Sequence, residues 1–277
     1  MADSSCRLCK SVSHLGELPP VRHQMRLPVH FELLFLCCAA AAAGAADIQL
    51  RAPSIICPFS DQSEPSKLQI GEPVTIPADQ QPMAGQIAFY HAEHSPGVFA
   101  PKGWSCRAWS GSNGTFLAVT PQRILPPYYP LPTITGPAVT VDSWDASSSG
   151  RFHVAIIAAQ LFSADGGEFS ARVRQDHLIS DASFTTAHSP DDDLRYVSDR
   201  IVEYTTAANR KGLGTDSMLD SSNSPIRGLI TLDLKNESNA LTEIRVKLPP
   251  NLTPVADAIL QLETVCVQLQ QGCRALQ

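Results

Sequence analysis

An alanine-rich stretch near the N-terminus decides which part of this chain can fold. Residues 25–46 read MRLPVHFELLFLCCAAAAAGAA, in which Arg26 supplies a positive start and Leu33 to Ala43 carries no charge. The small residues at its end suit a signal peptidase that cuts after Ala46, and cleavage one residue earlier is nearly as plausible. The uncharged run is shorter than the about 20 apolar residues of a membrane-spanning helix. We therefore expect a cleaved signal peptide and a mature chain in the periplasm or outside the cell, with no transmembrane segment.

The 24 residues before this signal can be interpreted in two ways. They are polar and precede a second methionine, Met25, with which a well-formed signal begins. We favour Met25 as the true start, and the alternative is a genuine long n-region with Arg7, Lys10 and Arg22. In both cases residues 1–46 are a leader that the mature protein lacks.

Composition permits a folded core and argues against one class of partner. Hydrophobic residues make up 43% of the chain, and 21 Lys and Arg stand against 27 Asp and Glu, a net charge of −6. Removing 46 of 277 residues leaves 231, which suits one large domain or two small ones. Because nucleic-acid affinity depends on Lys and Arg replacing counterions, we expect no nucleic acid as a partner.

Turn signals and proline divide the mature chain into three parts. Residues 47–125 contain short apolar runs and the turn SGSNG, which predict a β-rich N-terminal region with a hairpin. Residues 126–137 are rich in proline and predict a linker or long loop. Residues 138–277 combine strand and helix patterns and predict an α+β region.

The last helix is the most regular element of this third part. Thr253 can cap it, and Pro254 stands at its first position, where a missing N–H costs nothing. Earlier, a helix begins near Gly150 and is expected to end at residues 165–167. The C-terminal helix carries an apolar stripe, which we expect to cover an antiparallel sheet formed by the preceding strands. The stripe consists of Val255, Ile259, Leu262, Cys266 and Leu269.

Four cysteines follow the leader, an even number that suggests disulfides in an exported chain. We expect Cys57 to pair with Cys106, tying the N-terminal segment to the first β-region. Cys266 and Cys273 would be about 10 Å apart in an unbroken helix, beyond disulfide reach. Gly272 can end the helix and let the chain fold back, so a Cys266–Cys273 disulfide is feasible; two free thiols are the alternative.

Two stretches carry a resemblance. GVFAPKGWSC (97–106) with the following GSNGTFLAVTP, and YTTAANRKGLGTDSMLDSSNSPIRGL (204–229), resemble a group of uncharacterised exported bacterial proteins. That group pairs a Gly-Val-x-x-Pro-(Lys/Arg)-Gly-Trp-x-Cys segment with a later Gly-Leu-Gly-Thr loop. The resemblance spans most of the mature chain and supports export, but it implies no activity, ligand or catalytic residue.

One segment could hold a metal ion. His91, Glu93 and His94 lie within four residues, but the segment precedes a Ser-Pro pair and reads as a loop. No HExxH pattern is present, and a catalytic zinc needs three protein ligands. We therefore expect a solvated loop, no metal and no cofactor.

A glycine-rich loop is the strongest candidate for ligand binding. Gly212, Gly214 and Thr215 could cradle an anion with backbone N–H groups, and Arg210 and Lys211 add positive charge beside them. The alternative is a tight structural loop that uses glycine for its conformational freedom. No P-loop or dinucleotide fingerprint surrounds these residues, so the structural interpretation is favoured.

A hydrolase would need a nucleophile, a base and a group that orients the base. Ser217 and Asp216 follow the glycine-rich loop and could be combined with a histidine, either His153, His177 or His188. No G-x-S-x-G elbow is present.

The aromatic segment around Trp104 and Trp109 is expected to pack in the core rather than to form a binding platform. These observations favour a non-catalytic envelope or secreted protein that binds a partner through a β-rich surface. A periplasmic or secreted hydrolase is the alternative, and the catalytic residues, ligand and partner stay unknown.

Overall fold

The computed structural model describes the greater part of the chain that follows the predicted leader. All of these residues belong to one compact unit, Asp47–Gln277. The predicted leader, His188, Gly272 and Cys273 lie outside the described residues. The residues described are 50–60, 69–76, 83–124, 131–162, 165–178, 180, 184 and 192–268.

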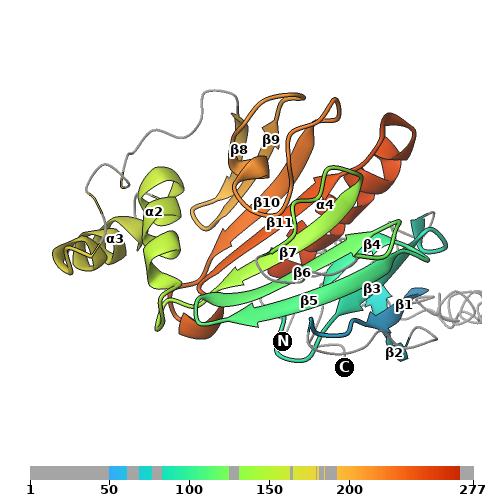
Figure 1. Ribbon diagram of the computed structural model, residues 1–277, viewed down its shortest axis with the longest axis horizontal. Coiled ribbons are helices and arrows are strands. Elements are labelled where there is room, and N and C mark those ends of the chain that lie inside the picture. The colour runs from blue at the N-terminus through green and yellow to red at the C-terminus, as the bar shows by residue number, and fades with distance from the viewer. Residues whose placement is uncertain are drawn as a thin grey trace, which may run out of the picture. The chain divides into compact units, whose positions relative to one another are not determined.

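Seven antiparallel strands form the main sheet, in the order β5-β6-β7-β11-β10-β9-β8 (Figure 1). Local hairpins make three of its pairings, β5–β6, β8–β9 and β10–β11, while β7–β11 joins strands that are far apart in sequence. The strands are β5 (Ser105–Gly111), β6 (Gly114–Thr120), β7 (Ala138–Trp144), β8 (Asp192–Ser198), β9 (Ile201–Thr206), β10 (Ile226–Leu232) and β11 (Leu241–Lys247).

A second, four-stranded sheet has the order β2-β1-β3-β4 and is mixed, because β1 and β3 are parallel. Its buried residues share one hydrophobic core with one face of the main sheet. The strands are β1 (Leu50–Ile56), β2 (Gln69–Ile76), β3 (Ile87–His91) and β4 (Val98–Pro101).

The described residues also form the α-helices α2 (Arg151–Leu161), α3 (Asp165–Gln175) and α4 (Thr253–Gln268). The expectation that residues 165–167 only end a helix is wrong, since α3 begins there. The physical reason is a close approach of the two helices: a Cβ on Gly166 would lie 2.8 Å from the Ala158 carbonyl oxygen. Glycine therefore serves helix contact at this position rather than helix termination.

The main sheet has one apolar face. Leu117, Val141, Ile244 and Leu229 point to this face, and all of them are buried. The four-stranded sheet and α4 cover it, with Ile259 and Leu262 of α4 fully buried in the same core. The predicted α+β architecture, with an antiparallel sheet covered by the C-terminal helix, is confirmed.

The opposite face of the main sheet, called the polar face below, carries a row of buried charged and polar side chains. Strand alternation places Asp142, Glu243, Arg245 and Lys247 on this face together with Tyr204. It is covered by α2 and by two loops, residues 131–137 and 207–225, whose side chains pack on it.

The proline-rich segment 126–137 stands between two paired neighbours of the same sheet. β6 precedes it and β7 follows it, and the two strands are antiparallel over six residue pairs, from Gly114↔Trp144 to Val119↔Val139. The predicted β-rich and α+β regions therefore share one sheet.

Cys57 and Cys106 form the predicted disulfide, with Cα atoms 5.4 Å apart. The bond joins the segment after β1 to the outer strand β5, and a backbone bond from Ala108 N–H to Pro58 O lies beside it. Cys266 is also disulfide-bonded. Its predicted partner Cys273 lies outside the described residues, so that pairing stays a prediction.

Candidate functional site

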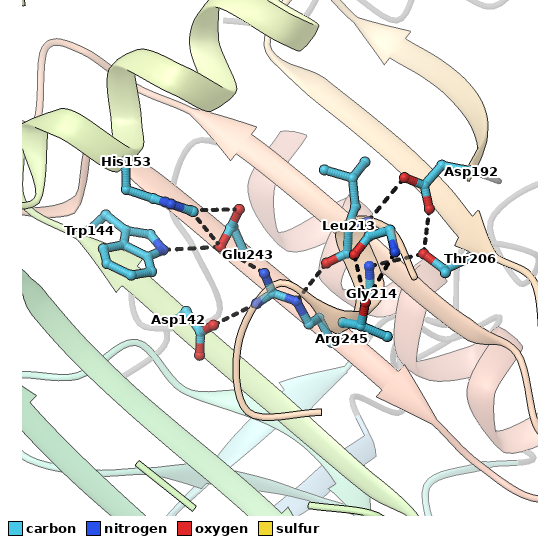
Figure 2. A network of polar contacts seen from close by, with 11 residues as sticks. Asp142, Trp144, His153, Asp192, Thr206, Leu213, Gly214, Glu243 and Arg245 are labelled. Atoms are coloured by element: carbon cyan, nitrogen blue, oxygen red, sulfur yellow. Dashed lines mark hydrogen bonds and ion pairs between the residues drawn. The ribbon is translucent and has the colours of Figure 1, made fainter. Parts of the chain in front are cut away.

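The candidate site lies on the polar face, where β7 and β11 are neighbours (Figure 2). Glu243 stands directly opposite Asp142 in the pairing of these strands, and Arg245 follows on the same face. Two carboxylates side by side in the middle of a sheet repel each other and lose their hydration. The position of Arg245 beside both is therefore the feature that makes the arrangement possible.

Arg245 uses its guanidinium on three partners. Nη1 donates to Asp142 Oδ2 at 2.5 Å, Nη2 to Glu243 Oε2 at 2.9 Å, and Nε to the carbonyl oxygen of Leu213 at 3.1 Å. Asp142, Glu243 and Arg245 are each at most 1% exposed. The group thus joins both carboxylates to the loop that covers them.

Burial and charge act in opposite directions on these groups. Burial lowers the pKa of Arg245, but Glu243 and Asp142 outweigh it and raise that pKa. Burial raises the pKa of Glu243, but Arg245 and then His153 hold it well below its usual range. The pKa of Asp142 is raised because burial outweighs the charge of Arg245, and a hydrogen bond with Ser217 lowers it only in part.

His153 of α2 approaches this group from above the sheet. Its Nε2 lies 3.3 Å from each oxygen of Glu243, and its ring stacks on Trp144 with centroids 4.0 Å apart. Trp144 Nε1–H donates to Glu243 Oε2 at 3.0 Å. Burial lowers the pKa of His153, but the charge of Glu243 and their hydrogen bond outweigh it, so this pKa is raised.

The glycine-rich loop lies on the polar face next to Arg245, and its amides donate within the protein. Leu213 N–H donates to Asp192 Oδ2 at 3.0 Å and Gly214 N–H to Thr206 Oγ1 at 2.9 Å. Gly212 N–H donates to Thr215 Oγ1 at 3.0 Å. The Asp192 carboxylate thus occupies the place that an anion would take in the predicted cradle.

The glycines of this loop are needed for close packing on the sheet. A Cβ on Gly212 would lie 2.3 Å from Asp192 Oδ1, and one on Gly214 would lie 2.7 Å from Ile226 Cβ. These distances support the structural interpretation of the loop. Arg210 and Lys211 are exposed beside it.

Lys247 supports the covering loops in the same manner as Arg245. Its Nζ donates to the carbonyl oxygens of Ile134, Thr135 and Asp220 at 2.9–3.0 Å. Burial lowers the pKa of Lys247. A single side chain therefore ties both loops to β11.

Asp216 and Ser217 follow the glycine-rich loop and lie near this network. The charges of Asp216 and His153 act on each other, which raises the pKa of His153. The pKa of Asp216 is itself raised, first by burial and then by the charge of Glu243. Of the other predicted histidines, His177 is exposed after α3 and His188 lies outside the described residues. The structure therefore brings His153 to this segment.

The proposed metal ligands are spread over a strand end and a turn. His91 is the last residue of β3, whereas Glu93 and His94 lie in the exposed turn that follows. Within the described part of the chain, no group of three His, Cys, Asp or Glu residues is arranged to hold a metal ion. The solvated-loop interpretation fits Glu93 and His94, whereas His91 belongs to the strand and its ring stacks on Phe89.

The two tryptophans of the KGWSCRAW segment differ in burial. Trp109 is 3% exposed and packs with Phe116 on the polar face, as expected for a core residue. Trp104 is partly buried against the shared core, and its backbone N–H donates to Tyr90 Oη at 3.1 Å. Burial raises the pKa of Tyr90 to about 12, so its hydroxyl stays protonated as a fixed hydrogen-bonding group.

A shallow groove lies elsewhere, between α4 and the open end of the sheet at β8–β10. It consists of two hollows of about 180 and 260 Å³ that share Arg195, Glu203, Arg227 and Leu260. Two ion pairs lie among its lining residues, Arg195–Glu203 and Arg227–Asp257. The groove therefore carries both charges.

Sequence reasoning missed the buried charges, although a local signal exists. The strand AVTVDSW places Thr140, Asp142 and Trp144 at alternate positions, and LTEIRVK does the same with Glu243, Arg245 and Lys247. Alternation of this kind usually marks a solvated sheet face. Here loops cover the face, which the local pattern does not reveal.

In comparisons with protein-family models, curated proteins and solved structures, the chain matches none. No helix among the described residues is long and apolar enough to cross a membrane.

Proposed function

We propose that this chain is an exported envelope or secreted protein with a binding or structural role and no catalytic one. The observation that carries the proposal is the use of the buried charges. Arg245 and Lys247 bond to loop carbonyls, Asp192 bonds to a loop amide, and the carboxylates of Asp142 and Glu243 bond to Arg245. These groups build the fold, since each is engaged by a neighbour within the protein.

Export is supported by the leader and by the cysteines. The disulfide Cys57–Cys106 is of a kind that persists in oxidising compartments and is rare in the cytosol. We place the mature protein in the periplasm or outside the cell on this ground and on the anatomy of residues 25–46.

The groove beside α4 is the surface that we assign to a partner. Its ion pairs are partly exposed, with the Arg195 side chain 70% accessible, so they can exchange for charges of a bound molecule. Exposed pairs of this kind contribute at most about 1 kcal/mol each and are therefore cheap to rearrange. A polar partner with both charges, such as a segment of an envelope protein, fits this chemistry.

A hydrolase is the second candidate, and one observation favours it. His153 and Asp216 lie close enough for their charges to interact, beside Ser217. Against it, Ser217 acts on the pKa of Asp142, while Nε2 of His153 faces Glu243. A serine nucleophile needs its hydroxyl on the imidazole.

Turnover assays on matched variants separate the two candidates. The substrates are chromogenic esters, amides, phosphate esters and glycosides. We expect any turnover of them by the purified protein to be the same in wild type and in Ser217→Ala. Turnover that is lost in both Ser217→Ala and His153→Gln, with the fold retained by circular dichroism, would overturn the non-catalytic proposal.

Export is tested by N-terminal sequencing of the native protein and by thiol labelling before and after reduction. The proposal expects a start at Asp47, or one residue earlier, and no labelling of Cys57 before reduction. A recovered leader together with reduced thiols would contradict it.

A further inference from the structure

His153 joins the peripheral helix α2 to the middle of the sheet, and its contact is made through a titratable group. Its Nε2 lies 3.3 Å from both oxygens of Glu243, which is itself 1% exposed on β11. The His153 side chain is 19% exposed, so a proton can reach it from the solvent. The contact therefore combines a buried acceptor with an accessible base.

Charged side chains from two strands and one loop surround the His153 ring. Glu243 and Arg245 come from β11, Asp216 from the loop after Gly214, and Asp142 from β7 beyond Arg245. Trp144 of β7 stacks on the ring, and its N–H bonds to the same carboxylate. The charges of Glu243 and Asp216 favour a charged imidazole, whereas the charge of Arg245 opposes it.

The other contacts described between α2 and the sheet are made by apolar side chains. Val154, Ile157, Ala158 and Leu161 face the core that contains Tyr204 of β9. A charged hydrogen bond to a carboxylate is roughly twice as strong as a neutral one. The protonation state of His153 therefore sets how firmly the start of α2 is held.

We propose that His153 and Glu243 form a pH-sensitive latch: the protonated imidazole holds the first turns of α2 against the sheet, and loss of the proton loosens α2 and the loop at Asp216. This inference is independent of the proposed binding role. It concerns an exported protein whose surroundings can change in pH, and the loosened region is the one that covers the buried charges.

The direction of the pH effect follows from linkage. Because the folded-state pKa of His153 lies above its ordinary value, protonation stabilises the latch below that ordinary value. The stabilisation is lost as pH rises through the folded-state pKa. Opening of α2 is expected to increase about tenfold for each pH unit that separates the two pKa values.

The test follows the His153 ring and the α2 amides in the purified chain. NMR titration of the ring is expected to give a pKa above about 6.5, the ordinary value for histidine. Hydrogen exchange of the amides of Val154–Leu161, corrected for intrinsic rates, is expected to show more opening above that pKa than below it, relative to α4.

Two variants make the test specific. His153→Gln keeps a donor for Glu243 but no titratable charge, so the pH dependence of α2 opening is expected to vanish. His177→Asn is the control: His177 is exposed with φ +52°, a conformation that asparagine tolerates, and the wild-type pH dependence is expected to remain. A ring pKa at or below the ordinary value, pH-independent opening in wild type, or unchanged pH dependence in His153→Gln would each overturn the latch. The ring titration of the wild type decides the question even if the glutamine variant does not fold.

Discussion

The apolar face of the seven-stranded sheet is covered by α4 and a second sheet, whereas the polar face is covered in large part by loops. Helices and strands satisfy their own backbone hydrogen bonds, so the sheet beneath them can be apolar. Loops bring carbonyl and N–H groups that need partners when buried. On the polar face Arg245, Lys247 and Asp192 supply those partners. On this sheet, therefore, charged side chains are buried where loops cover the face, and apolar side chains where a helix and a second sheet cover it.

The largest effect is expected on the polar face, from Arg245→Met. Removal of the guanidinium leaves Asp142 buried without its countercharge, Glu243 with His153 as its only charged partner among those described above, and the Leu213 carbonyl without its donor. We expect a loss of about 3–5 kcal/mol in the free energy of unfolding, measured by urea denaturation. Arg195→Met is the matched control: its exposed pair with Glu203 predicts a loss below about 1 kcal/mol. Equal losses of unfolding free energy in the two variants would contradict the claim that the buried charge of Arg245 stabilises the polar face.

On the apolar face, we expect the Cys57–Cys106 disulfide to contribute more to the free energy of unfolding than charged groups do. Cys57 and Cys106 are 49 positions apart, and their removal as a Cys57→Ala/Cys106→Ala pair is expected to cost about 2–4 kcal/mol. Denaturation of the oxidised wild type and of the double variant, both under nonreducing conditions, measures this. A double variant as stable as the wild type would show that the bond is dispensable.

A close aromatic contact offers a smaller effect on the polar face. A Cβ on Gly228 would lie 2.3 Å from the ring of Tyr204, so Gly228→Ala forces the ring away from β10. We expect a loss of about 1–3 kcal/mol. Gly167→Ala in α3 is the control, since a Cβ there meets nothing within 4 Å and alanine favours a helix. The midpoint of thermal unfolding should fall in Gly228→Ala and rise in Gly167→Ala.

Glu263 of α4 is a buried titratable group in the core on the apolar face. Its Oε1 accepts from Phe99 N–H at 2.7 Å, and burial raises its pKa to about 8. Because the folded-state pKa is raised, this group stabilises the fold below pH 4.5 and loses that contribution as pH rises toward 8. Glu263→Gln should remove this dependence, which amounts to at most about 1.4 kcal/mol per pH unit.

Urea denaturation from pH 5 to pH 8 measures the difference between wild type and Glu263→Gln. Glu93→Gln, on an exposed turn, is expected to follow the wild type throughout. A difference that stays constant with pH would show that Glu263 is ionised in the core.

The sequence predicted the parts that local pattern controls. The apolar stripe on Thr253–Gln268 and the β5–β6 hairpin follow from periodicity and turn residues. The second helix α3 was missed because Gly166 reads as a helix end, whereas here it permits contact with Ala158. Local signals therefore describe elements well where no tertiary contact overrides them.

The site was beyond local pattern for a different reason. Asp142 and Arg245 are 103 positions apart, and only the β7–β11 pairing brings them together. The sequence did single out Gly212 and Gly214, but it could not show that the Leu213 amide between them would donate to the carboxylate of Asp192. Pairing of distant strands decides the first fact, and packing of the loop on β8 and β9 decides the second.

Hydrogen exchange at Leu213 and Gly214 tests most directly whether buried charge on the polar face serves the covering loop. In Asp192→Ala we expect these two amides to exchange at least about tenfold faster, because Leu213 loses its acceptor and Thr206, which Gly214 contacts, loses its partner. Amides of β7 and α4 should keep their wild-type protection. Unchanged exchange at both loop amides in a folded Asp192→Ala variant would contradict the account.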